Sequence, residues 1–448
     1  MSELPQGWSL AAISDITDAI PNVRPENEPE REFAYIDISS VDNSNFMVTE
    51  TKTFLGKDAP SRARRPVKPY DVIFSNVRTY LRNIALITEE TNADVCSTGF
   101  TVLRPNGAVD PRYLFRYVLS DAFIDSVTPQ QTGTHYPATS DRVVMGETIP
   151  LPPLPEQRRI VAKLEQVLAR VDACRSRLEQ VPTILKRYRQ SVFAAACSGR
   201  LTEDFQEDTT SWEQVPLVDI ITELRNGIPT RPNQSPPGTQ MLRISSVRPG
   251  KVDINDIRFL PASEDLIEKY TLRNGDLLFT RYNGSQDLVG VCGIVRSLGN
   301  RILLYPDKLM RVRVNTEKVL PEYLELYFSD ASTRDIIMAA SKSSAGQIGI
   351  SGGSLKATPV SLPPLAVQQE IVRRVTDLFA LVDQVEARYA QAKTHVDRLT
   401  QSILAKAFRG ELVPQDPADE PAKALLARIV AKHGKGTPTR MAQRQKAK

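Results

Sequence analysis

The sequence predicts an α+β fold made of two copies of one unit, each a variable domain followed by a long helix. First, LPPLPEQRRIVAKLEQ at Leu151 returns as LPPLAVQQEIVRRVTD at Leu362, and this offset of 211 residues continues without a gap through Thr202 and Val413, with 20 identities in 52 positions. Second, short runs of β-branched residues bounded by Gly, Pro, Asn and Asp precede each copy, as expected of strands. Third, the apolar positions inside each copy follow a heptad spacing.

The two variable domains also correspond, although more loosely. IleSerSerVal at 38–41 recurs at 244–247, YDVIFS at 70–75 aligns with GDLLFT at 275–280, and DPRYLFRY at 110–117 aligns with LPEYLELY at 320–327. The last pair predicts one amphipathic helix in each domain. We therefore expect an N-terminal variable domain at 1–150, a helical spacer at 151–202, a second variable domain at 203–361, a second helical spacer at 362–413 and a C-terminal tail at 414–448. The tail contains a short helical pattern, AKALLARIVAKH, followed by a basic stretch that we expect to be disordered.

Each helical segment carries an apolar stripe at alternating spacings of four and three. More than four heptads of this kind predict a coiled coil, and the connectivity favours an antiparallel one with a variable domain at each end. The alternative is that each helix packs only on its own domain. Prolines in LPPLP and LPPL mark the helix starts, Gly199 and Gly410 mark the ends, and Pro182 is expected to kink or break the first helix. The stripe residues are Ile160, Leu164, Val167, Val171, Cys174, Leu178, Val181, Leu185, Tyr188 and Val192, and then Ile371, Val375, Leu378, Val382, Val385, Tyr389, Ala392, Val396, Leu399 and Ile403.

Composition and motifs argue against catalysis by this chain. Three histidines and four separated cysteines leave no multi-histidine metal site, zinc knuckle or redox pair. G-x-S-x-G, the P-loop, a dinucleotide-binding G-x-G-x-x-G and the N-P-P-Tyr or N-P-P-Phe signature of adenine methyltransferases are all missing. No apolar run approaches the roughly 18 residues that span a bilayer, and no secretory signal pattern opens the sequence, so we expect a cytoplasmic protein. These absences favour a binding and positioning role.

Charge is distributed unevenly along the chain. The formal net charge is −6 for 1–150, +6 for 151–202, −2 for 203–361, +1 for 362–413 and +5 for 414–448. Neither variable domain has the basic excess of a stand-alone nucleic-acid binder, but both contain local arginine clusters and Gly-containing polar loops. Such residues suit contacts with phosphates and guanine, and they equally suit solvated faces and ordinary turns. The candidates are Arg62, Arg64, Arg65, Lys68, Arg78, Arg82, Thr132, Gly133, Thr134, His135 and Tyr136 in the first domain, and Arg243, Arg248, Arg273, Arg281, Arg296, Ser344, Gly346 and Gln347 in the second.

The sequence resembles the specificity subunits of type I restriction-modification systems over nearly its whole length, to about Pro414. The resemblance rests on LPPLPEQRRIVAKLEQ with QSVFAAACSGRLT, on LPPLAVQQEIV with QSILAKAFRGELVPQDP, on the GWS opening and on the loop TGTHYPATSDRVV. AVQQ at Ala366 departs from the more usual EQ-containing start, which puts partner docking at the second helix in doubt.

The resemblance implies that each variable domain is a target recognition domain that reads one half of a split sequence in double-stranded DNA. The helices would set the distance between the halves and dock two adenine methyltransferase subunits, and restriction subunits would join for cleavage. S-adenosylmethionine, ATP and Mg would belong to those partners, with no cofactor or metal in this chain. Two other hypotheses stay open: a coiled-coil adaptor whose variable domains bind proteins, and a fused methyltransferase or nuclease with diverged motifs.

Overall fold

A computed structural model describes residues 4–133, 135–205, 212–344 and 347–433. The chain forms two compact units. One unit comprises Met1–Leu178 with Ala392–Lys448, and the other comprises Glu179–Gln391. Each unit thus contains one variable domain and part of each long helix.

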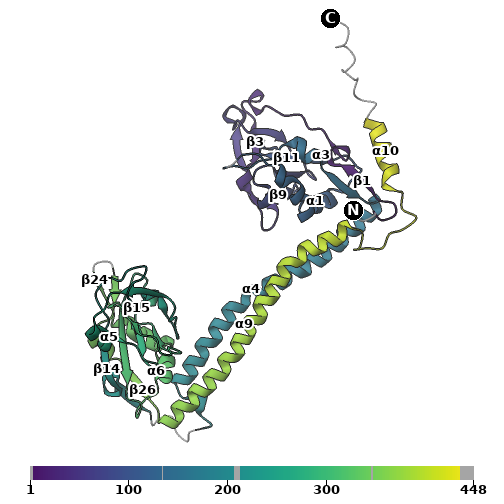
Figure 1. The fold of residues 1–448 in the computed structure, drawn as a ribbon. Coiled ribbons are helices and arrows are strands. Elements are labelled where there is room, and N and C mark those ends of the chain that lie inside the picture. The colour runs from purple at the N-terminus through teal and green to yellow at the C-terminus, as the bar shows by residue number, and fades with distance from the viewer. Residues whose placement is uncertain (1–3, 134, 206–211, 345–346, 434–448) are drawn as a thin grey trace. The chain divides into compact units, whose positions relative to one another are not determined.

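The first variable domain begins and ends on one antiparallel strand pair, β1 (Ser9–Ala12) with β12 (Thr148–Leu151). Between them lie an antiparallel sheet of order β2-β11-β8-β9 and a mixed sheet of order β6-β3-β10-β7, in which β3 and β10 are parallel (Figure 1). The strands are β2 (Thr17–Asp18), β3 (Glu32–Ile36), β6 (Lys52–Leu55), β7 (Ala63–Pro66), β8 (Val72–Ser75), β9 (Ile84–Leu86), β10 (Val95–Ser97) and β11 (Phe100–Pro105), with β4 (Val41–Asp42) and β5 (Met47–Val48) as a small hairpin.

Three short helices complete this domain: α1 (Pro111–Val118), α2 (Asp121–Val127) and α3 (Asp141–Gly146). The Asp110 carboxylate accepts from the backbone N–H of Arg112 at 2.9 Å, and Pro111 occupies the first helical position, where a missing N–H costs nothing. Helix α1 buries Tyr113 and Leu114 in the core. The amphipathic helix expected at 110–117 is therefore present.

The second variable domain repeats this plan. It is bounded by β13 (Glu213–Pro216) paired with β26 (Pro359–Leu362), and it contains an antiparallel sheet of order β14-β23-β19-β21 and a mixed sheet of order β18-β15-β22. Its other elements are β14 (Ile221–Asn226), β15 (Thr239–Leu242), β16 (Val247–Arg248), β17 (Lys251–Val252), β18 (Ile257–Leu260), α5 (Glu264–Tyr270), β19 (Leu277–Thr280), β20 (Tyr282–Asn283), β21 (Cys292–Ile294), β22 (Leu303–Leu304), β23 (Leu309–Val314), α6 (Pro321–Tyr327), α7 (Ala331–Ala339), β24 (Lys342–Ser344), β25 (Gln347–Gly349) and α8 (Gly352–Lys356). The prediction of two α+β domains built on one plan is confirmed.

The long helices are α4 (Leu154–Cys197) and α9 (Leu365–Phe408), and parts of them lie side by side within each unit (Figure 1). In the first unit Arg175 pairs with Asp397 at 3.9 Å. In the second unit Arg189 pairs with Asp383 at 2.8 Å, and the ring centroids of Phe193 and Phe379 are 5.2 Å apart. Residue numbers rise along one helix as they fall along the other, so the helices are antiparallel in each unit.

The apolar stripe of each long helix packs against the other helix and also against a variable domain. In the first unit Ile160 and Leu164 are buried in one cluster that also contains Leu404 and Phe408 of α9 and the core of the variable domain. In the second unit Ile371 and Val375 share a cluster with Val192 and that domain's core. Each helix therefore packs both on the other helix and on a variable domain. Of the other stripe residues, Val171, Val382 and Val396 are buried, Cys174, Tyr188 and Val385 are exposed, and the rest are half-buried: Val167, Leu178, Val181, Leu185, Leu378, Tyr389, Ala392, Leu399 and Ile403.

The expected break at Pro182 is wrong, because α4 continues through Pro182 as one helix of 44 residues. Pro182 is exposed, so its ring displaces no buried side chain, and the helix loses one backbone hydrogen bond there. Buried packing at Val171 and Val192 holds the helix on both sides. Gly199 and Gly410 follow the helix ends in the left-handed region, with φ of 80° and 76°, where glycine carries no steric penalty.

A buried glutamine fastens each long helix to its variable domain. Gln157 accepts from the backbone N–H of Asp110 at 2.7 Å and donates to the carbonyls of Ala108 and Pro152. Gln368 accepts from Leu320 at 2.8 Å and donates to the carbonyls of Lys318 and Pro363. Both glutamines are fully buried, and each uses its amide oxygen and both amide N–H groups in the same way.

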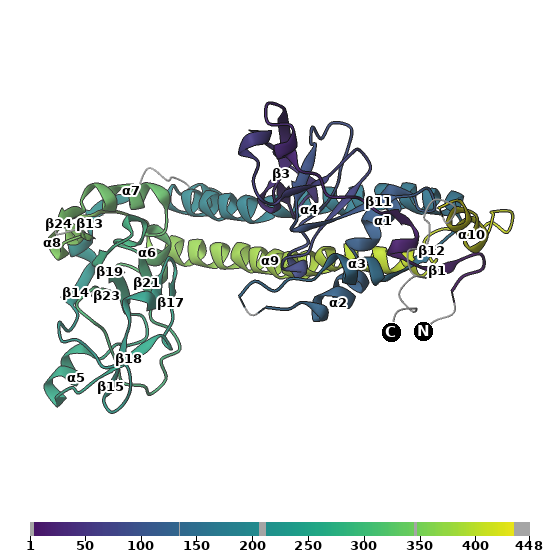
Figure 2. The same cartoon turned by 90° about the horizontal axis from the view of Figure 1, so that it is seen from above.

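The C-terminal tail is part of the first unit as far as α10 (Ala422–His433), which lies beside β1 and β12 (Figure 2). Ala422 is buried in the core of that unit, and Leu426 and Ile429 pack against it. Asp419 pairs with Arg159 of α4 at 2.7 Å. The helical pattern in the tail is thus a packed helix, whereas the basic stretch from 434 lies outside the described residues.

Candidate nucleic-acid interface

Two of the predicted elements of the first domain come together at Arg78. The backbone N–H of Arg78 donates to the carbonyl of Pro137 at 2.8 Å, and its guanidinium donates to the carbonyl of His135 at 3.4 Å. The 132–138 loop folds back on itself through paired bonds between Thr132 and Ala138. Its side chains at His135 and Tyr136 are exposed, Tyr136 by 74%. Gly133 has a φ of 98°, which a side chain would resist, and Thr134 lies outside the described residues.

The turn that follows Arg78 is held by a hydrogen bond and carries an exposed aromatic ring. Arg78 and Arg82 both adopt positive φ, 49° and 53°, on either side of a single 3-10 turn, Thr79–Leu81. The turn is fastened by a bond from the Asn43 amide to the carbonyl of Leu81 at 3.0 Å. Tyr80 is nevertheless 53% exposed. Strained backbone that carries an exposed aromatic side chain is typical of a contact surface.

Three of the predicted arginines in this domain are already engaged within the protein. Arg64 forms a two-point ion pair with Glu26, and this guanidinium lowers the pKa of Glu26 to about 2. Arg82 pairs with Asp121 and donates to the carbonyl of Leu119.

Arg65 pairs with Asp141, whose carboxylate also accepts from Thr101 at 2.7 Å and from Asn76 at 3.1 Å. This network fastens β7 to the start of α3. Arg62 and Lys68, by contrast, are exposed and have no side-chain ion pair with the part of the chain that the structure describes.

The predicted arginines of the second domain are more accessible. Arg243 is exposed and pairs with Asp256 at 3.2 Å, and Arg248 and Arg273 are exposed. The guanidinium of Arg281 lies 4.7 Å from the ring centroid of Tyr282.

Directly after Arg281, β20 pairs with β25, which in turn pairs with β24; Ser344 belongs to β24 and Gln347 to β25. Gly346 lies outside the described residues. Arg296 belongs to a structural pair with buried Glu325.

A basic pocket of about 560 Å³ in the second domain was not predicted. It contains predicted Arg243 together with Arg231, Arg258 and Lys308. These four cations are dispersed along the sequence, so no local pattern could have revealed that they face one cavity.

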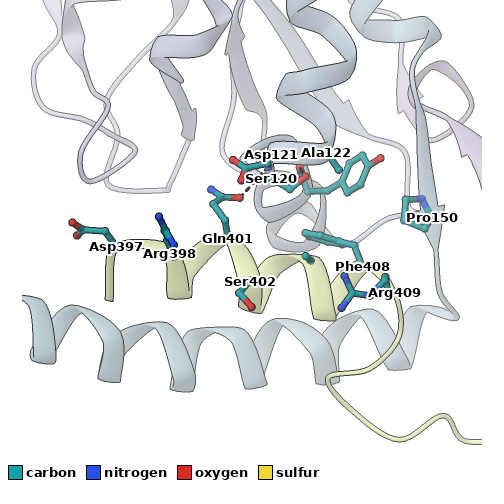
Figure 3. Close-up of a pocket in the computed structure, with 12 residues that line it drawn as sticks. Ser120, Asp121, Ala122, Pro150, Asp397, Arg398, Gln401, Ser402, Phe408 and Arg409 are labelled. Atoms are coloured by element: carbon teal, nitrogen blue, oxygen red, sulfur yellow. Dashed lines mark hydrogen bonds between the residues drawn. The ribbon is translucent and has the colours of Figure 1, made fainter. Parts of the chain in front are cut away.

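The first unit contains a larger cleft, of about 750 Å³, between α9 and the start of α2 (Figure 3). Gln401 of α9 accepts from the backbone N–H of Asp121 at 2.9 Å and donates to the carbonyl of Leu119 at 3.3 Å, so it satisfies groups at the junction of α1 and α2. Phe408 lies edge-on to Tyr117, with 5.0 Å between the ring centroids. The cleft thus lies where the helix joins the domain.

Within the described ranges, no three His, Cys, Asp or Glu side chains gather as a metal site would require. Burial raises the pKa of the Cys96 and Cys292 thiols, which keeps both thiols protonated and unreactive. No helix in the described part of the chain is long and apolar enough to cross a membrane.

The family model for the type I restriction modification DNA specificity domain matches the chain twice, at residues 7–183 and 210–394. The chain belongs to this specificity family. It is 39% identical to the type I restriction enzyme EcoKI specificity subunit of Escherichia coli strain K12, over 96% of both chains. It is 32% identical to the StySPI specificity subunit of Salmonella potsdam, also over 96% of both.

Solved structures agree with this assignment. A chain from a study of complex assembly and conformational transition of the type I R-M system matches with a TM-score of 0.72 and 26% identity, over 92% of this chain and 100% of that one. The HsdS subunit of Thermoanaerobacter tengcongensis matches with a TM-score of 0.64 and 28% identity, over 91% and 98%. The specificity subunit described here is accordingly a DNA target-recognition protein rather than a catalytic subunit or a protein-binding adaptor.

Proposed function

We propose that each variable domain reads one half of a bipartite sequence in double-stranded DNA, and that α4 and α9 set the spacing between the halves. The main support for this proposal is that the two repeats share the same helix–domain contacts but differ in their candidate contact groups. Gln157 and Gln368 make the same three hydrogen bonds in the two repeats, whereas the candidate contact groups differ: half-buried Arg78 with exposed Tyr80 and Tyr136 in one domain, and a basic pocket in the other. Two independent readers on one frame suit a two-part target.

The partners in this proposal are two adenine methyltransferase subunits and restriction subunits. The helical part of the second unit exposes Ile184, Tyr188, Leu381 and Val385, which supports docking of a partner there. S-adenosylmethionine, ATP and Mg would be held by those partners, and the assembly would act on DNA in the cytoplasm. The net charge of only +4 fits a chain whose partners supply much of the contact with phosphate.

The test is long-read sequencing of genomic 6-methyladenine in cells with and without this gene. The expected result is a two-part methylated motif that disappears with the gene. Replacing residues 1–150 by the equivalent domain of another specificity subunit should then change one half of the motif and preserve the other. Methylation that is unaffected by the deletion, or both halves changing together, would contradict the proposal.

A further inference from the structure

The basic pocket of the second variable domain lies at the edge of the β18-β15-β22 sheet. Its walls come from four places: 228–232 before β15, 242–245 at the end of β15 and just after it, 306–308 between β22 and β23, and Arg258 on β18. Ile228, Met241, Leu260 and Leu304 form a small buried cluster in the same sheet region. The pocket is therefore supported by packed strands.

The charges around this pocket are unbalanced. Arg231, Arg258 and Lys308 make no ion pair or side-chain hydrogen bond with any residue that the structure describes. Other arginines of the same domain have acidic partners: Arg225 pairs with Glu223, and Arg313 pairs with Asp276. Asp307 is the acid among the described lining residues, against three unpaired cations and Arg243, which pairs with Asp256 outside the lining. The mutual repulsion of these cations would be relieved by a bound anion.

The loop that carries Arg231 is held in place before any ligand binds. At one end Ile228 donates its N–H to the carbonyl of Tyr305 at 3.0 Å, and at the other Asn233 exchanges two backbone bonds with Phe259. Pro229 and Pro232 restrict the backbone between these points. Gly227 packs so closely on Pro306 that a Cβ would lie 2.1 Å from its carbonyl oxygen. Binding would cost little ordering of the backbone.

The equivalent place in the first domain has a different charge. Asp37 precedes the IleSerSerVal repeat there, as Arg243 does in the second domain, and Lys52 lies across from Tyr35 as Arg258 lies across from Met241. Asp37 caps the following turn and lies 3.7 Å from the ammonium of Lys52. The first domain thus pairs Lys52 with Asp37, whereas in the second domain Asp256 pairs with Arg243 and leaves Arg258 without an ion pair among the described residues.

We propose that this pocket binds phosphate groups of the DNA backbone beside the half-site that the second domain reads, an inference that rests on the proposed function. Guanidinium and ammonium groups from separate segments suit the several oxygens of a phosphodiester, and the Thr230 hydroxyl adds a further donor. Such contacts set the position of the domain on the duplex and carry no base preference.

The experiment compares Arg231→Ala, Arg258→Ala and Lys308→Ala in the complete complex with its methyltransferase partner, on a duplex that carries the mapped motif. Dissociation constants are measured between about 50 and 200 mM salt. Each variant should weaken binding to target and to unrelated DNA by a similar factor, and should reduce the salt slope by about one. Asp307→Asn should strengthen binding. Lys251→Ala, which removes an exposed cation outside the pocket, is the control and should leave the slope unchanged.

Two results would overturn the phosphate assignment. An unchanged salt slope in all three variants, with specific binding by the unaltered complex, would show that the pocket does not meet DNA. A relaxed preference at one base of the methylated motif would show base reading instead. Failure of the proposed function is a separate result, because the unaltered complex would then bind DNA without sequence preference.

Discussion

The guanidinium of Arg78 lies over the ring of Tyr136, with 5.2 Å between its Cζ and the ring centroid. The contact joins an arginine cluster to a glycine-containing loop, and Arg78 is 57 residues away from its other loop partner, His135. Arg78 is half-buried and Tyr136 is exposed, so both retain surface that can meet a ligand. We therefore propose this pair as a contact with DNA in the first domain.

Replacing Arg78 or Tyr136 by Ala should therefore weaken binding of the methyltransferase complex to its target by about 1 to 3 kcal/mol, the range for a specific base contact. Arg64→Ala is the matched control, because that guanidinium is held by Glu26. Titration of a fluorescent duplex with each complex measures the difference in binding free energy between the variants and the unaltered protein. Equal affinities for all three variants and the unaltered protein would place the reading surface elsewhere, first at Tyr80.

Asp141→Ala should destabilise the first domain without acting through DNA. The carboxylate accepts from Thr101 and Asn76 and pairs with Arg65, so its loss leaves partly buried donors unpaired, at a cost of about 2 to 3 kcal/mol. Thermal unfolding, followed by circular dichroism, measures this loss of stability. Asp121→Ala is the control, since this more exposed carboxylate should contribute about 1 kcal/mol or less. Comparable melting temperatures for both variants would argue against the Asp141 network.

Gln157→Leu and Gln368→Leu should each loosen one domain and spare the other. Each substitution removes three buried hydrogen bonds and leaves backbone groups unsatisfied, at about 1 to 3 kcal/mol per group. Hydrogen exchange resolved by peptide is the measurement, with faster exchange at 106–112 in the first variant and at 316–322 in the second. Each variant serves as the control for the other. Faster exchange in both domains of either variant would mean that the domains do not respond independently.

Glu156→Gln should raise the melting temperature at neutral pH. Burial raises the pKa of Glu156, whose side chain accepts from the Trp8 indole at 3.1 Å. A raised folded-state pKa favours the protonated carboxyl, so its stabilising contribution is present at low pH and is lost as pH rises through the folded pKa. Glutamine keeps an acceptor for Trp8 without the charge. The gain in melting temperature from Glu156→Gln should shrink as the pH is lowered, which thermal unfolding at several pH values measures.

The length of the long helices should determine the spacer of the DNA motif. Seven residues inserted after Arg177 and seven after Arg388 preserve the heptad phase and add about 10.5 Å, which corresponds to at most about three base pairs. The measurement is the methylated motif of the doubly extended protein, with circular dichroism as the control for folding. A folded, active variant with an unchanged spacer would mean that the methyltransferase partners set the distance.

The sequence predicts those parts of the fold that depend on neighbouring residues or on the internal repeat. The 211-residue repeat, the heptads and the LPPL starts were sufficient for two α+β domains and two antiparallel helices, and Gly199 and Gly410 marked both helix ends. Pro182 shows the limit of such signals, because α4 continues through this exposed proline and is packed at Val171 and Val192 on either side of it. In the AVQQ start of the second repeat, Val367 stands where the first repeat has Glu156. Gln368 nevertheless makes the same hydrogen bonds as Gln157, so this sequence difference does not change how α9 is attached to its variable domain.

The sequence by itself determined the duplicated frame, since hydrophobic spacing and helix-end residues act between neighbours along the chain. Only the tertiary structure decided which cations are free. Arg64, Arg65 and Arg82 resemble Arg62 and Arg78 in sequence, but folding places Glu26, Asp141 and Asp121 against the first three. The same folding brings Arg231, Arg258 and Lys308 to one pocket, where none of them forms an ion pair with a residue that the structure describes. An arginine's role depends on the charge that lies a few ångströms away in space, and residues distant in the sequence supply that charge.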